Sequence, residues 1–142
     1  MKVSTVITVA FASAASAYPY NVYSVGAKGW LMQSADNSSL LFDSDINMAT
    51  NWTVEIRNDV HAFQNDATGD YISCDDERAC KASKEPGDFT IEGPYWDTSM
   101  AATYVIGVPN DDSVWTADNH FLLHAPADET DNQKFKIFEN KD

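Results

Sequence analysis

The sequence predicts an all-β protein made of three successive units of four short strands. Strand-like segments alternate with turns rich in Gly, Pro, Asp, Asn and Ser, which is the pattern of hairpin-connected strands. No long run places apolar residues at helical spacing between helix caps. A large aromatic residue opens a strand-like segment at Trp52, Phe89 and Phe135. The segments before each of these residues follow the same order, which indicates an internal repeat.

Each unit contributes four expected strands, bounded by turn residues. In the first unit, residues 18–58, they are 20–25, 30–34, 39–44 and 52–56. In the second unit, residues 59–96, they are 60–65, 70–74, 80–84 and 89–93. In the third unit, residues 97–142, they are 103–108, 113–117, 121–125 and 134–138.

Six aromatic residues fall at matching places in the three units. Trp30, Tyr71 and Trp115 lie in the second strands, and a further ring opens each fourth strand. One four-strand unit cannot bury such rings alone, so the units are expected to pack them together near a common axis. Each buried ring removes about 150–250 Å² from water, so these residues are the main expected source of stability.

This arrangement resembles the β-trefoil, in which three four-strand units form a six-stranded barrel capped by three hairpins. The resemblance covers the whole of residues 18–142. A seven-stranded sandwich is the alternative, but it leaves the threefold pattern as coincidence.

The N-terminal segment has the features of a secretory signal peptide. Lys2 precedes the apolar run VSTVITVAFA, and Ala15, Ser16 and Ala17 form a small-residue cleavage pattern. The run is shorter than the ~20 apolar residues that a membrane-spanning helix needs. We therefore expect residues 1–17 to be removed and residues 18–142 to form a single secreted, extracellular domain.

The charge of the protein excludes some classes of partner. The sequence carries 22 acidic and 9 basic side chains, a formal net charge of −13 at pH 7, and removal of Lys2 makes the secreted chain more acidic still. Such a surface repels phosphates, so neither nucleic acid nor an anionic membrane is an expected partner. The simplest interpretation of the acidity is solubility.

Two cysteines and two sequons fit an extracellular location. Cys74 and Cys80 flank five turn residues and are expected to form a disulfide, worth roughly 2 kcal/mol for so short a loop. No histidine lies near them, so no metal site is expected. Asn37 and Asn51 each begin an N-glycosylation sequon.

The segment DNQKF, residues 131–135, resembles the Q-x-W signature of ricin B-type lectins, with Phe135 in place of tryptophan. The resemblance implies that Gln133 and Phe135 support the core and that Asn132 contacts sugar hydroxyls. It also implies that His124 falls at or next to the position of the ring that stacks on the sugar.

The third unit also lacks another residue of the lectin pattern. The usual first-strand aspartate is absent, so Asp111 and Asp112 in the following turn are its only substitutes. The other units carry TNW and GDF, without the glutamine. The alternative role for Gln133 is to satisfy backbone groups at the base of the barrel.

Tyr95 and Trp96 have no counterpart in the other units. They lie beside Pro94 and Asp97, in a connection longer than the repeat requires. An exposed aromatic ring can stack on the apolar face of a sugar, so this segment is a second candidate partner surface. Alternatively, Trp96 folds back and plugs one end of the barrel.

No catalytic constellation is evident in the sequence. His120 and His124 are four residues apart, which is ~13 Å in an extended strand and too far to share a metal ion. The acidic clusters lie in turns and lack the spacing of a calcium loop. We therefore expect no enzymatic activity, no cofactor and no metal.

The residues favour a non-catalytic, lectin-like module that binds a glycan or cell-wall polysaccharide and acts as a monomer. One alternative is a secreted protease inhibitor that presents residues 94–102 to a protease. Another is an effector or cell-wall surface protein that binds an extracellular protein. Fold alone does not choose among them.

Overall fold

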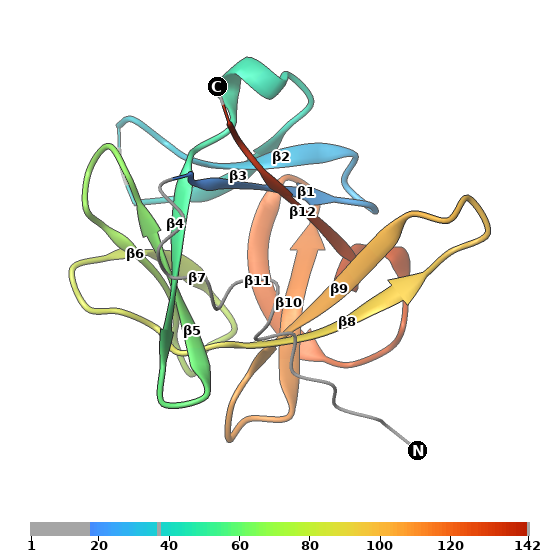
Figure 1. Ribbon diagram of the computed structural model, residues 1–142. Helices are drawn as coiled ribbons and strands as arrows, with labels where there is room; N and C mark the ends of the chain where they lie inside the picture. The colour runs from blue at the N-terminus through green and yellow to red at the C-terminus, as the bar shows by residue number, and fades with distance from the viewer. Residues whose placement is uncertain (1–17, 37, 142) are drawn as a thin grey trace.

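The described part of the protein is all-β, as predicted. The computed structural model describes residues 18–36 and 38–141, which form twelve strands and two single turns of 3₁₀ helix (Figure 1). The predicted signal peptide, residues 1–17, and the sequon residue Asn37 lie outside the described residues.

The strands lie close to their expected positions. The first four are β1 (Tyr20–Ser24), β2 (Gly29–Gln33), β3 (Leu40–Asp43) and β4 (Trp52–Arg57). The next four are β5 (Val60–Asn65), β6 (Tyr71–Cys74), β7 (Cys80–Ser83) and β8 (Thr90–Trp96). The last four are β9 (Ala102–Val108), β10 (Ser113–Asp118), β11 (Phe121–Pro126) and β12 (Phe135–Glu139). The 3₁₀ turns η1 (Ile46–Met48) and η2 (Asp131–Gln133) precede β4 and β12.

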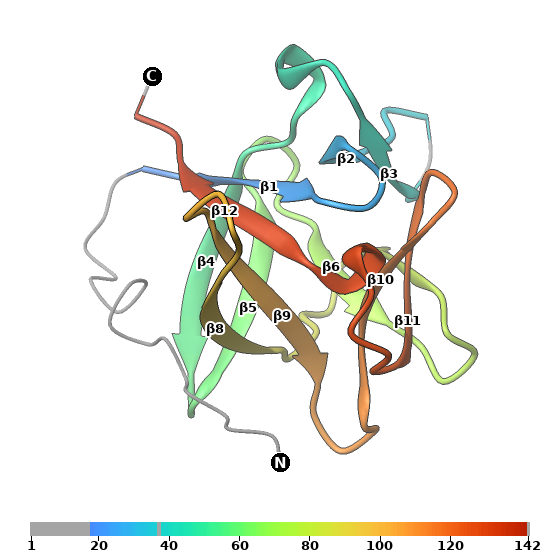
Figure 2. The same cartoon turned by 90° about the vertical axis from the view of Figure 1, so that its right-hand side faces the viewer.

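Six strands close into a barrel. β1 pairs with β4 and β12, β4 pairs with β5, and β9 pairs with β8 and β12 (Figures 1 and 2). The ring closes between β5 and β8, where His61 and Phe89 exchange backbone hydrogen bonds of 2.7 and 2.9 Å. The closed ring leaves no barrel strand without a neighbour on either side.

Three hairpins contact one another beside the barrel. They are formed by β2 with β3, β6 with β7, and β10 with β11. Single bridges join Phe121 to Leu41, Ser39 to Lys81, and Ala79 to Leu123. Each hairpin is therefore tied to both of the others.

The core is built from matching positions in the strand pairs. Trp52, Phe89 and Phe135 are at most 1% exposed, as expected. Trp115 is fully buried, with ring centroids 4.9 to 6.0 Å from those of Phe63, Phe89 and Phe135. These contacts join rings of the second and third predicted units.

The expectation that Trp30 and Tyr71 belong to this core is wrong. Both are only half-buried, whereas the next residues, Leu31 and Ile72, are fully buried. Successive residues of a strand face opposite sides, so a shift of one residue exchanges core and surface. Trp115 therefore corresponds to Leu31 and Ile72, and Trp30 lies on the outside against Tyr23, with ring centroids 5.0 Å apart.

The expected disulfide is present. Cys74 and Cys80 face each other at the ends of β6 and β7 and form the bond. It closes the turn at residues 75–79, which lies against β11 through the bridge from Ala79 to Leu123.

His61 is fully buried in β5, and burial lowers its pKa below the ordinary value despite an opposing backbone hydrogen bond with Phe89. The unfolded chain therefore binds a proton at His61 more readily than the folded protein does. Stability is highest above the unfolded pKa of about 6.5 and falls as pH decreases through it.

We predict that His61→Leu makes the free energy of unfolding less dependent on pH between about pH 7 and pH 5. One such histidine contributes at most about 1.4 kcal/mol per pH unit. Urea unfolding across this range measures the slope, and the exposed His120 supplies the matched control, His120→Gln. An unchanged slope in His61→Leu would contradict the assignment.

Candidate functional site

The segment around Tyr95 and Trp96 is the outer half of a long hairpin rather than a loose connection. β8 continues to Trp96, β9 begins at Ala102, and their pairing is interrupted by a bulge between Glu92 and Tyr95. The hairpin extends beyond the barrel (Figure 1). Backbone pairing therefore holds both aromatic residues in place.

Asp97 orders the tip of the hairpin. Its Oδ1 accepts hydrogen bonds from the Ser99 hydroxyl at 2.6 Å, the Ser99 amide at 2.9 Å and the Ala101 amide at 3.0 Å. These bonds lower the pKa of Asp97, and the bond from the Ser99 hydroxyl has the largest effect. The turn also places Met100 in the left-handed region, with φ of 65°. The tip is thus a compact turn held at neutral pH by an ionised carboxylate.

The two aromatic side chains on this hairpin are accessible. Trp96 is 63% exposed and Tyr95 is 41% exposed, so Trp96 does not plug the barrel. The Tyr95 carbonyl accepts a 3.0 Å bond from the Thr103 hydroxyl, and the Tyr95 hydroxyl lies 3.5 Å from the buried Glu92 carboxylate. The ring of Trp96 therefore offers the larger free surface.

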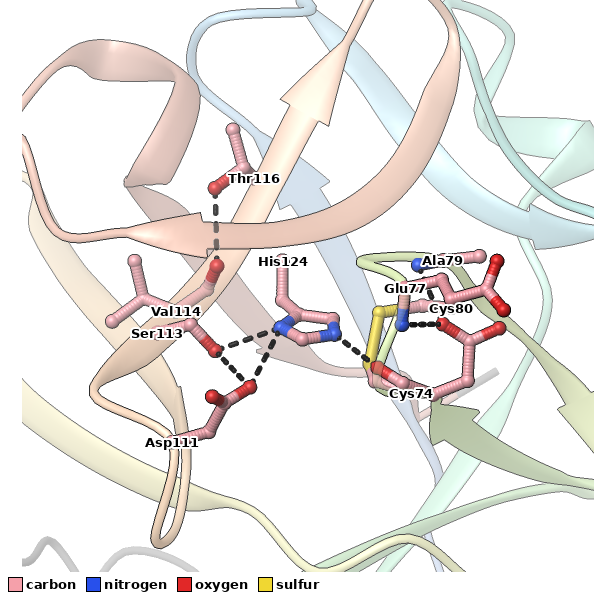
Figure 3. The surroundings of a disulfide bond; sticks show 10 residues. Cys74, Glu77, Ala79, Cys80, Asp111, Ser113, Val114, Thr116 and His124 are labelled. Atoms are coloured by element: carbon pink, nitrogen blue, oxygen red, sulfur yellow. Dashed lines mark hydrogen bonds and ion pairs between the residues drawn. A yellow bond between two sulfur atoms is a disulfide. The ribbon is translucent and has the colours of Figure 1, made fainter.

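His124 lies inside the protein, contrary to the expectation of a stacking ring. It is only 2% exposed. Its Nδ1 lies 2.7 Å from the Ser113 hydroxyl and 3.3 Å from the Asp111 carboxylate, and its Nε2 lies 2.5 Å from the Asp75 carbonyl oxygen (Figure 3). It occupies an inward position of β11, so its ring is packed between two hairpins.

The contact of His124 with Ser113 and Asp111 does not form a catalytic triad. In a catalytic triad the nucleophile and the carboxylate contact different nitrogens of the histidine ring. Here both Ser113 and Asp111 contact Nδ1, and the Asp75 carbonyl contacts Nε2. Sequence reasoning missed Ser113. The signal was available, because Ser113 lies two residues before Trp115 and so shares its face of β10.

Gln133 has the contacts of a structural residue. It is 2% exposed, its Oε1 accepts a 2.8 Å bond from the Asp128 amide, and its Nε2 donates to the Thr116 hydroxyl and the Pro126 carbonyl. Asn132, next to it, is exposed and lies against Gly26. Gln133 thus bonds neighbouring polar groups inside the protein, whereas the side chain of Asn132 lies at the surface.

The remaining polar residues of the predicted third-unit site are at the surface. Asp111 and Asp112 are exposed in the turn between β9 and β10, and Asp111 also accepts a 3.2 Å bond from Ser113. Since His124 is buried, this surface lacks the ring that the sequence assigned to it.

A polar groove lies between the first and second predicted units and was not expected from the sequence. Its volume is about 680 Å³. Gln33 donates to Asp70 at 2.9 Å and accepts from Asn65 at 2.7 Å, and Asp70 also pairs with Lys84 at 2.7 Å. The exposed sequon residue Asn51 lines this groove, and its Oδ1 accepts bonds from Asn21 and Asn140.

The described residues contain neither a metal-binding cluster nor a membrane-spanning helix. Within residues 18–36 and 38–141, no group of three or more His, Cys, Asp or Glu side chains is placed to hold a metal ion. No helix in the same ranges is long and apolar enough to cross a membrane.

Comparisons with known proteins identify the fold. No protein-family model and no curated protein matches the sequence. The structure is similar to a ricin B-like lectin from Macrolepiota procera in complex with lactose, with a TM-score of 0.67 and 17% identity over 83% of this chain and 92% of the lectin. The protein has the fold of a ricin B-like lectin.

A second similar structure is an endo-β-galactosidase from Clostridium perfringens that releases GlcNAcα1-4Gal. The TM-score is 0.70, at 13% identity, over 89% of this chain and 33% of that enzyme. The ricin B-like fold thus corresponds to only a third of the enzyme chain.

We predict that Gln133→Ala lowers the free energy of unfolding by about 2–3 kcal/mol, because it removes three partly buried hydrogen bonds and the side chain of a residue that is 2% exposed. Gln64→Ala is the matched control, since Gln64 is half-buried and makes a single 3.1 Å bond to Gly69. Its expected cost is below about 1 kcal/mol. Chemical denaturation measures both, and equal costs would contradict the structural role of Gln133.

Proposed function

We propose that this protein is a secreted β-trefoil domain that binds carbohydrate and catalyses no reaction. Its three units are residues 18–58, 59–96 and 97–142, and residues 1–17 are the signal peptide. The agreement of pairing register supports the threefold division, because Val22 with Ile137, Val54 with Phe63 and Ile91 with Ile106 occupy matching places. The disulfide supports an oxidising, extracellular location.

The observation that carries the sugar-binding proposal is the exposed Trp96 on an ordered hairpin. A pyranose has an apolar C–H face and a rim of hydroxyl groups, so its site needs an accessible ring with polar groups beside it. Trp96 is 63% exposed, and the Asp97 carboxylate and Ser99 hydroxyl are its neighbours along the tip. A lectin complexed with lactose shares the fold, which supports this ligand class.

We assign the stacking ring to Trp96 rather than to His124. The burial of His124 removes the aromatic partner that Asn132, Asp111 and Asp112 would need. Those three exposed residues are proposed to form hydrogen bonds with sugar hydroxyls, without an aromatic ring that stacks on the sugar.

The geometry of the hairpin tip disfavours the protease-inhibitor alternative. A segment that enters a protease cleft as an added strand has to be extended. The residue that would insert is Trp96 or Met100, and Met100 has φ of 65° within the Asp97 turn. The absence of a relay at His124 likewise disfavours hydrolysis by the Ser113 hydroxyl.

We predict that wild-type protein binds glycans on an array and that Trp96→Ala reduces this binding at least about tenfold, the loss expected for one stacked ring worth about 1.4 kcal/mol. Phe121→Ala is the control, because Phe121 is 54% exposed but lies on β11, outside the β8–β9 hairpin. Absence of binding by the wild type would refute the function. Loss in Phe121→Ala alone would refute the site.

If wild-type protein binds no glycan, the effector alternative becomes the leading one. Capture of an extracellular protein that depends on Trp96 would then identify the same hairpin as a protein-binding surface. The Trp96→Ala variant serves both experiments.

A further inference from the structure

Five consecutive strands present a single row of side chains on the outside of the barrel. The strands are β2, β1, β12, β9 and β8, each paired with the next. They connect the half-buried Trp30 at one edge to the hairpin with Tyr95 and Trp96 at the other. β12 pairs with β9 and so runs beside that hairpin (Figures 1 and 2).

The pairing register fixes which residues share this row. Trp30 pairs with Tyr23, and Tyr23 pairs with Lys136. Phe135 pairs with Tyr104, so the adjacent residues Lys136 and Thr103 are opposite each other. Thr103 in turn pairs with Tyr95, but it is only 5% exposed and contributes little surface to the row. Paired residues on neighbouring strands point to the same face.

The inward neighbours confirm that this face is the outer one. Phe135 and Val22, which alternate with Lys136 and Tyr23, are fully buried in the barrel. Phe138, two residues beyond Lys136, therefore also points outward, and it is 47% exposed. Its ring centroid lies 5.7 Å from that of Trp30, which in turn lies 5.0 Å from that of Tyr23.

The row is connected to the hairpin tip by charge. Hydrogen bonds from Ser99 are the main cause that lowers the pKa of Asp97, and the positive charge of Lys136 contributes to the same shift. Lys136 therefore lies within electrostatic reach of the residue that follows Trp96. By the pairing register, Tyr95 on the hairpin shares the outer face of the sheet with Tyr23 and Trp30.

We propose that this surface, consisting of Trp30, Tyr23, Phe138, Lys136 and Tyr95, binds an extended, neutral polysaccharide chain. Trp96 follows Tyr95 and points to the opposite face of the hairpin, so the chain passes over the edge of the hairpin between the row and the sugar stacked on Trp96. The inference rests on the proposed carbohydrate-binding function and names its ligand as a chain rather than a single terminal sugar.

The dimensions and openness of the surface fit a chain. Five strands at about 4.8 Å spacing span ~19 Å, which is longer than one pyranose. Rings stand toward both ends of the row, and Lys136 lies between them as a donor to hydroxyl groups. The groove at Gln33 and Asp70 and a second cavity at Arg57 and Pro109 have other linings and do not include this row.

The net charge of the protein explains why the bound polysaccharide should be neutral, and the packing of the core shows that it does not require the outer rings. The net charge of −13 opposes any polyanionic glycan. The core does not require Trp30, since Leu31 fills the inward position of β2. Partly exposed rings that packing does not require are the groups expected to contact a ligand.

The test is the dependence of affinity on chain length, measured with neutral oligosaccharides from disaccharide to hexasaccharide. The probes are cello-oligosaccharides, N-acetylglucosamine oligomers and xylo-oligosaccharides. We expect affinity for one series to rise at least about tenfold with length, since each added stacked ring is worth about 0.5–1.5 kcal/mol. Phe138→Ala and Trp30→Ala should remove most of that gain and change disaccharide binding less than about twofold.

The variants separate failure of this inference from failure of the function. Trp96→Ala should weaken binding at every length, and Phe121→Ala should change none. Equal affinity for disaccharide and hexasaccharide, or an undiminished gain in folded Phe138→Ala, would overturn the extended site and leave sugar binding intact. Absence of binding to all three series would overturn both. Because Trp30 is half-buried, Phe138→Ala supplies the decisive result if Trp30→Ala does not fold.

Discussion

The fold depends on mutual burial of inward-facing rings from three parts of the chain. Trp52, Phe89 and Phe135 each begin or precede a barrel strand, and none of their own four-strand segments could cover them. Trp115 contacts two of the three, and Phe63 as well. At about 25 cal/mol per Å², each ring contributes on the order of 4–6 kcal/mol of transfer free energy. Barrel closure is the arrangement that collects all of them in one core.

The hairpins place a further requirement on the third unit. The disulfide-closed turn lies against β11, where the His124 amide donates to the Arg78 carbonyl at 3.0 Å and Nε2 reaches the Asp75 carbonyl. Buried polar groups are costly unless paired, and His124 supplies hydrogen-bond partners to two carbonyl groups of this turn. A residue with this structural task cannot also present its ring to a ligand.

Strand positions followed from the sequence because turn residues and strand propensity are local properties. Which side chains point into the core and which point to the surface did not follow from the sequence. Aligning the units on their largest aromatics matched Trp30 with Trp115, whereas burial matches Leu31 with Trp115. The same difference of one position made His124 look like a surface ring. The length of the β8–β9 hairpin was also hidden, since Gly93 and Pro94 read as a strand end while pairing resumes at Tyr95.

The difference between the two sides of the barrel wall tells where ligand specificity can reside. Inward positions such as Leu31, Ile72 and Trp115 are fully buried, because they fill one shared core, and are therefore out of reach of a ligand. Outward positions are free of that requirement, and there the segments differ. Trp30 has Tyr71 at the equivalent place on β6, while the Tyr95 and Trp96 pair occurs on one hairpin alone. A chain that retains the fold of a lectin while its third-unit histidine is committed to packing can still recognise a sugar, provided that recognition uses the outer face.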